Sequence, residues 1–166
     1  GSWVSTDLIE SGQWHNAVLV FDGSLPDAER LKGYLDGNLI GSAATGGTAL
    51  RAHPGQNAVG AAFNVALFHD GVSSNDNSHF FGGDIDEIRL WTVARTPAEL
   101  AATNTVQLMG NEPGLALYYP MDQGTACGDN SGISMLEDAT GPLDGTMSGL
   151  LLNGSLSCTL HCTLCS

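Results

Sequence analysis

Hydrophobic and polar positions alternate with a period of two over residues 14–21, WHNAVLVF, before Asp22 and Gly23 interrupt the pattern. Successive side chains of a β-strand point to opposite faces of a sheet, so this period indicates a strand rather than a helix. The aspartate and glycine favour a turn. The pattern therefore predicts a strand that ends near Phe21.

A hairpin is predicted immediately downstream, in the stretch LKGYLDGNLIGS. Asp36 and Gly37 separate two short apolar runs, and both residue types tolerate a positive φ. Residues 31–35 should therefore pair with residues 38–42. Residues 57–68, NAVGAAFNVALF, have small side chains that suit a further strand packed closely against a neighbouring sheet. The polar stretch that follows, residues 69–79, is predicted to be a loop.

Residues 80–91, FFGGDIDEIRLW, read as a buried strand interrupted by acids. Ile85 has one parity, whereas Ile88 and Leu90 have the other, so a regular strand would expose one apolar set. A β-bulge at residues 86–87 would return all three side chains to one inward face. We then expect Glu87 and Arg89 on the solvent side. Asp86 should accept hydrogen bonds from backbone N–H groups released by the bulge.

A short helix is predicted directly after this strand. Thr96 can cap the helix, Pro97 suits its first position, and Glu99 completes a capping box, so the helix should span residues 97–103. Residues 115–122, LALYYPMD, then predict another strand. The Gly-, Ser- and Asp-rich residues 124–149 predict loops and short extended pieces.

Composition and charge limit the partners. With 166 residues, of which 42% are apolar, the chain supports one hydrophobic core. A net charge of −13 repels nucleic acid and anionic lipid. No stretch reaches the roughly 18 apolar residues that cross a bilayer. The first residues lack the basic, apolar and small-residue pattern of an export signal, and a signal can have preceded Gly1. We expect no nucleic-acid partner and no membrane insertion, and the composition favours a secreted protein that meets divalent cations or neutral glycans.

The loop of residues 69–79 offers oxygen ligands of the kind that calcium prefers, from Asp70, Asn75, Asp76 and Asn77. The alternative is a solvated connection in which these side chains bond their own backbone. A second metal hypothesis adds carboxylates of the interrupted strand, giving the candidate ligands Asp70, Asp76, Asp84 and Asp86. Calcium is the one cofactor predicted.

Four cysteines are present, and three of them lie in the last nine residues. An even number in a chain of this character predicts two disulfides in an oxidising compartment. Zinc binding with His161 is the alternative, although paired Cys-x-x-Cys motifs are missing. Asn153 begins an acceptor sequence for N-glycosylation. The disulfide candidates are Cys127, Cys158, Cys162 and Cys165.

Three stretches occur in this order between Trp14 and Leu100, WHNAVLVFDG, LKGYLDGNLIGS and FFGGDIDEIRLWTVARTPAEL, and the resemblance that they carry covers residues 13–108. Together they resemble the C-terminal half of laminin G-like domains, which belong to the concanavalin A-like jelly-roll superfamily. The resemblance implies an all-β, antiparallel β-sandwich (jelly roll) with one short helix after the bulged strand. It also implies non-catalytic recognition of glycans, matrix proteins or receptors, frequently with calcium.

The resemblance also suggests the organisation of the chain. Residues 1–109 resemble the second half of a module, residues 110–149 resemble the opening strand and loop of a further module, and residues 150–166 form a cysteine-bearing tail. Before Trp14, only Trp3 and Val4 resemble part of the first half of a module. Either residues 115–152 fold back to fill the vacant strand positions, as in a circular permutation, or sheet edges stay open for another chain.

Two functions are therefore predicted. The first is a non-catalytic, extracellular recognition or adhesion module, at the cell surface or secreted, that binds a glycan or protein through loops such as residues 70–79. The second is a structural subunit of an extracellular filament or array that is assembled by strand complementation and cysteine cross-links. A glycosidase, the third hypothesis, needs two carboxylates about 5 to 10 Å apart. No triad or phosphate-binding loop is present, so we expect no enzyme.

Overall fold

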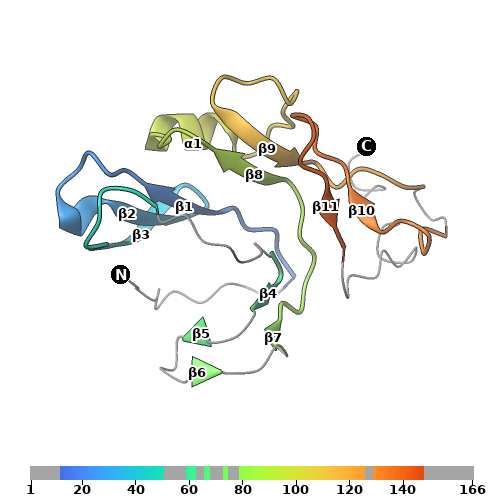
Figure 1. Cartoon of the computed structure of the whole chain (residues 1–166), viewed down its shortest axis with the longest axis horizontal. Coiled ribbons are helices and arrows are strands. Elements are labelled where there is room, and N and C mark those ends of the chain that lie inside the picture. The colour runs from blue at the N-terminus through green and yellow to red at the C-terminus, as the bar shows by residue number, and fades with distance from the viewer. Residues whose placement is uncertain are drawn as a thin grey trace. The chain divides into compact units, whose positions relative to one another are not determined.

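A computed structural model describes residues 12–50, 59–62, 66–67, 73–74, 79–125 and 129–147 (Figure 1). Every strand pair in this part of the chain is antiparallel, and its one α-helix is short, as the sequence predicts. The chain divides into two compact units. The first combines Gly1–Asp84 with Ala94–Val106, and the second combines Ile85–Val93 with the residues from Gln107 onward.

The central sheet of the first unit has the order β1–β2–β3, with β1 at Ala17–Phe21, β2 at Leu31–Leu35 and β3 at Asn38–Ala43. The turn between β2 and β3 has φ values of 49° at Asp36 and 79° at Gly37. Two positive φ angles give the backbone twist that a tight hairpin needs. The predicted strand and hairpin are therefore confirmed.

Two aspartates hold the loops of this sheet. The Asp36 carboxylate accepts hydrogen bonds from the His15 ring and the Asn16 backbone N–H, both at 2.8 Å, and these bonds lower the pKa of Asp36. Asp27 begins the 3-10 helix η1 (Asp27–Glu29). Its carboxylate accepts from the backbone N–H of Gly46 at 2.9 Å, which lowers the pKa of Asp27, and it also pairs with Arg30 at 2.9 Å. Short acidic side chains thus replace missing backbone partners in the turns.

The helix α1 (Pro97–Thr103) supplies one wall of the core of the first unit. Thr96 accepts from the Glu99 backbone N–H, and the Glu99 carboxylate accepts from the Thr96 backbone N–H, so the predicted capping box is confirmed. This cap directs Leu100, the one buried residue of the helix, onto Val20 and Tyr34 of the sheet. All three side chains are at most 8% exposed.

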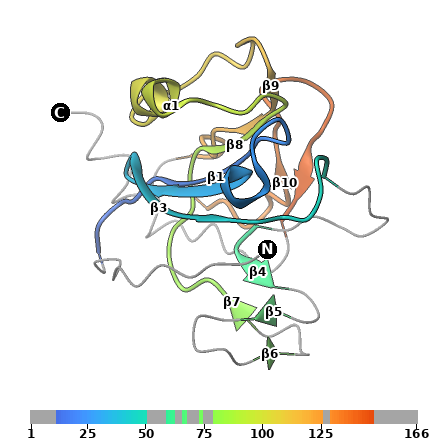
Figure 2. The same cartoon turned by 90° about the vertical axis from the view of Figure 1, so that its left-hand side faces the viewer.

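Two short ladders complete the described part of the first unit. Strand β4 (Ala61–Ala62) pairs with β7 (His79–Phe80), and β5 (Ala66–Leu67) pairs with β6 (Ser73–Ser74). Figures 1 and 2 show these ladders and α1 on opposite sides of the β1–β2–β3 sheet. Residues 57–68 were predicted to be one strand and residues 69–79 a loop. The described residues instead include two short strands in the first stretch, and β6 lies within the predicted loop.

The ladder of the second unit joins β8 (Ile88–Trp91) to β9 (Leu115–Tyr119). Glu87 has a left-handed backbone with φ of 55°, which ends the extended conformation just before β8. The Asp86 carboxylate accepts a hydrogen bond from the Glu87 backbone N–H at 3.0 Å, as predicted. The irregularity in the ladder, however, lies between Leu90 and Trp91. The predicted bulge at residues 86–87 is therefore wrong, because the left-handed residue turns the chain before pairing starts.

The predicted common inward face is also wrong. Leu90 is 58% exposed, whereas Ile85 and Ile88 are partly buried. The expectation that Glu87 and Arg89 face solvent fails as well, because their side chains are only 31% and 12% exposed and pair with each other. The side chains of Glu87 and Arg89 are thus largely covered, although the sequence pattern predicted that they face solvent.

The rest of the second unit is built from loops and one further short ladder, β10 (Met135–Leu136) with β11 (Gly145–Thr146). Leu136 is 7% exposed. The prediction of loops with short extended pieces is confirmed for the described residues of this region. The predicted strand at residues 115–122 is confirmed as β9, which ends at Tyr119.

Candidate functional site

A buried tyrosine organises the β8–β9 ladder. Tyr118 is 1% exposed, and its hydroxyl donates to the Glu87 carboxylate, whose oxygens lie at 2.8 and 2.9 Å. The same hydroxyl accepts from the Leu108 backbone N–H at 3.2 Å. The Arg89 guanidinium carbon lies 5.7 Å from the centroid of the Tyr118 ring, and Arg89 also pairs with Glu87. The charged pair is therefore held against an aromatic face.

Burial, and then the hydrogen bond to Glu87, raise the pKa of Tyr118 to about 12. A phenol with this pKa keeps its proton at neutral pH and serves as a fixed hydrogen-bond donor. Glu87 and Arg89 compensate each other's charge beside it. This cluster stabilises the strand pair.

Asp138 closes the edge of β9 that faces away from β8. Its carboxylate accepts from the backbone N–H groups of Tyr118 and Thr140, both at 3.0 Å, and of Leu143 at 3.2 Å. The Ala139 N–H donates to the Tyr118 carbonyl at 2.9 Å. Burial alone would raise the pKa of Asp138, but these bonds outweigh it, and the pKa lies below its usual value.

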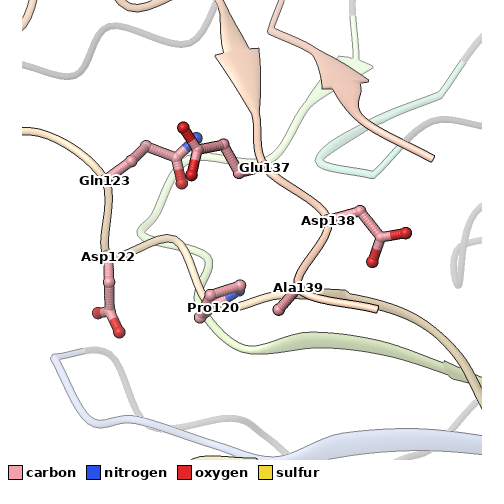
Figure 3. A pocket seen from close by; sticks show the side chains of 6 residues that line it. All are labelled: Pro120, Asp122, Gln123, Glu137, Asp138 and Ala139. Carbon is pink, nitrogen blue, oxygen red and sulfur yellow. The ribbon is translucent and has the colours of Figure 1, made fainter. Parts of the chain in front are cut away.

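A hollow of about 280 Å³ adjoins this edge (Figure 3). A second hollow of about 380 Å³ shares two of its residues, Gln123 and Glu137. The Gln123 amide donates to the Met135 carbonyl at 2.7 Å, so its oxygen remains as an acceptor. The first hollow is lined by Pro120, Asp122, Gln123, Glu137, Asp138 and Ala139.

The three carboxyl groups of the first hollow do not converge. In Figure 3 the Glu137 side chain lies beside Gln123, whereas Asp122 and Asp138 point away from it in different directions. Asp122 accepts from the Gln107 side chain, and Asp138 is occupied at the strand edge. Glu137 has no hydrogen-bond partner among the described residues. Such a rim offers acceptors to hydroxyl or cationic groups and repels anions.

Most of the sequence-predicted site residues lie outside the described residues. These are the loop ligands Asp70, Asn75, Asp76 and Asn77, the four cysteines Cys127, Cys158, Cys162 and Cys165, and the glycosylation candidate Asn153. Asp84 and Asp86 are described, and both are exposed. Within the described ranges, no three His, Cys, Asp or Glu side chains gather as a metal site would require. The calcium, disulfide and glycan assignments stay predictions.

The residues around which the second unit is organised were not predicted from the sequence. Tyr118 was part of a predicted strand, but its burial and its contacts to Glu87 and Arg89 were not anticipated. One signal was available in the sequence. Glu87 and Arg89 lie at one predicted strand and the pair Tyr118-Tyr119 lies in another, so pairing of these strands would bring the charges to an aromatic ring. Asp138 gave a weaker signal, since the sequence D-A-T-G is one of many turn-like stretches.

The family model of the concanavalin A-like lectin/glucanases superfamily matches residues 2–101. This match covers more than half of the chain, and the chain therefore belongs to this superfamily, whose fold is a β-sandwich jelly roll. Comparisons with curated proteins and with solved structures gave no match.

Laminin G-like domains of this superfamily are generally non-catalytic binding modules and are typically extracellular. No helix in the described part of the chain is long and apolar enough to span a membrane.

Proposed function

We propose that this chain is a non-catalytic extracellular module that recognises a neutral glycan or a protein partner. Its membership of the superfamily is the observation on which this proposal rests. The structural roles of its carboxylates support the non-catalytic part of the proposal. Asp27, Asp36, Glu87, Glu99 and Asp138 all accept hydrogen bonds that fix turns, caps or strand edges. Acids occupied in this way are not poised as a catalytic pair.

The hollow beside Gln123 and Glu137 is the part of the described surface that suits such a ligand best. Sugar hydroxyls donate to carboxylate and amide oxygens, and both acceptors line the two hollows. The net charge of −13 disfavours sulfated or phosphorylated ligands. We therefore propose a neutral or amine-bearing glycan, or a protein segment that presents hydroxyl and basic groups.

The test is a binding screen with immobilised neutral, amine-bearing and sulfated glycans. Binding of neutral or amine-bearing glycans should fall at least about tenfold in the variant Gln123→Ala with Glu137→Gln, because each lost polar contact costs on the order of 1 kcal/mol. Glu29→Gln, an exposed change in the first unit, is the matched control and should bind normally. Binding that is unaffected by the paired change would exclude this hollow.

Calcium at the loop of residues 69–79 is proposed as a stabilising partner of the same module. Melting of the full chain would be compared in calcium and in chelator. Binding to the folded state should raise the melting temperature in calcium, and Asp76→Asn should remove the increase. Identical melting in both solutions would refute the calcium proposal and leave the recognition proposal intact.

A structural subunit assembled by strand complementation is the second candidate function. One observation favours it: β8 lies within the family-matched residues 2–101, but its pairing partner β9 lies beyond them. Light scattering over a range of concentrations distinguishes the two candidates. A subunit should grow in mass with concentration, whereas a simple recognition module should remain monomeric.

A further inference from the structure

Strand β8 pairs with β9, which comes from a separate segment of the sequence. The second unit takes Ile85–Val93 from the first half of the chain and everything else from Gln107 onward. Between these two pieces, Ala94–Val106 belongs to the first unit. The β8–β9 ladder therefore joins two segments that are separated in sequence by residues of the first unit.

The side chain of Tyr118 makes the polar contacts of this ladder. Arg89 pairs directly with Tyr118 in the register of the ladder, with Ile88 opposite Tyr119 and Leu90 opposite Leu117. In this register Tyr118 places its hydroxyl on the Glu87 carboxylate and its ring near the Arg89 guanidinium. A strand displaced by one residue would turn this ring to the opposite face. The observed register therefore brings Tyr118 to the Glu87–Arg89 pair of β8.

The donated strand has its outer edge already closed. The backbone N–H and carbonyl of Tyr118 point away from β8, and Asp138 and Ala139 satisfy them. The Thr140 hydroxyl lies 3.2 Å from the Ala116 carbonyl oxygen and 2.8 Å from the Asp138 carboxylate, and it can donate its one proton to either. An open edge would template the addition of more strands. The cap occupies the backbone groups of Tyr118 that a further strand would need on this side.

We propose that β8 of one copy of this chain accepts β9, with its Asp138–Thr140 edge cap, from a second copy. This proposal rests on the second candidate function, for which it names the contact. The two copies are identical, so the exchanged ladder contains the same hydrogen bonds as the internal one. Concentration and the geometry of residues 92–114 then decide between the two forms. The edge cap occupies backbone groups of Tyr118 that a third strand would need to extend the exchanged ladder.

The experiment mixes two full-length chains, each with one new cysteine. One copy is isotopically labelled and has Leu90→Cys, and the unlabelled copy has Leu117→Cys. These positions are opposite in the ladder. After the mixture is unfolded and refolded together, a short thiol-reactive linker is added, and mass spectrometry maps the joined peptides. A 90–117 cross-link between labelled and unlabelled peptides is expected, and it can arise only between copies.

Two further variants test the role of the tyrosine. Tyr118→Ala in the Leu117→Cys copy should lower the yield of this cross-link at least about tenfold, and Tyr118→Phe, which keeps the ring, should lower it less. Tyr119→Phe is the matched control and should preserve the yield. A yield that is independent of Tyr118 would overturn the proposal, because it would show non-specific association.

The remaining outcomes separate this proposal from the function on which it rests. A third chain that has both Leu90→Cys and Leu117→Cys reports the internal ladder. If 90–117 cross-links form in this chain but not between the two single-cysteine copies, exchange at β8 is refuted. If assembly with concentration persists in that case, the subunit function stands and uses a different contact. If the chain also stays monomeric at every concentration, both the exchange and the subunit function are refuted.

Discussion

The β1–β2–β3 sheet and the β8–β9 ladder are held by different forces. The sheet is formed by neighbours in sequence, and its core consists of Val20, Tyr34 and Leu100. The ladder joins strands separated by residues 92–114, and Tyr118 is fixed by polar contacts to Glu87 and Leu108. An apolar core tolerates small changes of side chain. In a buried polar network, removal of one member leaves its partner without a hydrogen bond, and the free energy of unfolding falls by the cost of that unpaired group.

The largest effect is expected for Asp138→Ala. Three backbone N–H groups would lose their acceptor, and the free energy of unfolding should fall by about 3 kcal/mol in urea titrations. Asp129→Ala is the matched control and should cost about 0.5 kcal/mol, because Asp129 is exposed and, among the described residues, bonds only the nearby Ser131. Equal losses in the two variants would mean that the edge cap does not stabilise the ladder.

Acid should weaken the same cap. The pKa of Asp138 is lowered in the folded state, so its stabilisation is present above the ordinary carboxyl pKa of 3.8 and is lost as the pH falls through the lower folded value. The acid-induced loss of stability should therefore be smaller in Asp138→Ala than in the parent chain. Other aspartates, including Asp27, contribute to the loss in both proteins.

Leu100→Ala tests the apolar core of the first unit. Truncation of this buried leucine should lower the free energy of unfolding by about 2–3 kcal/mol, because the contacts with Val20 and Tyr34 are lost and a cavity remains. Leu39→Ala is the control, since Leu39 is 56% exposed, and should cost less than about 1 kcal/mol. Similar costs at both positions would contradict the assignment of α1 to the core.

Tyr118→Phe removes one hydroxyl from the ladder and should cost about 1–2 kcal/mol at neutral pH. The pKa of Tyr118 rises from 10.0 to about 12 on folding, so its contribution is complete below pH 10 and is lost as the pH rises towards 12. Unfolding measured between pH 9 and pH 12 should show a shallower alkaline decline in this variant. Tyr119→Phe is the control, and its alkaline loss of stability should still include the contribution of Tyr118. An unchanged decline in Tyr118→Phe would refute the buried phenol as its source.

The smallest effect is expected at the start of α1. Thr96→Ala removes the acceptor for the Glu99 N–H and should cost about 1 kcal/mol in thermal or urea unfolding. Thr105→Ala, just beyond the helix and exposed, is the control and should change stability by less than about 0.5 kcal/mol. A Thr96→Ala variant as stable as this control would show that the capping box contributes nothing measurable.

The sequence predicted the elements whose signals are local. The Asp36-Gly37 turn and the Thr96–Glu99 capping box each depend on backbone angles that only a few residue types support within a few positions. The strands at Ala17–Phe21 and Leu115–Tyr119 follow from alternation and apolar content. The membership of the superfamily, inferred from three stretches, was confirmed by the match to residues 2–101.

The sequence by itself thus determined where the chain turns, where its helix begins and which superfamily it belongs to. Only the tertiary structure decided that Leu90 faces outward while Glu87 and Arg89 lie against Tyr118. The physical reason is that an acid and a base look solvent-exposed in a sequence, but they can be buried when they compensate each other's charge and a distant hydroxyl completes their hydrogen bonds. That partner lies beyond α1, outside the reach of any local pattern.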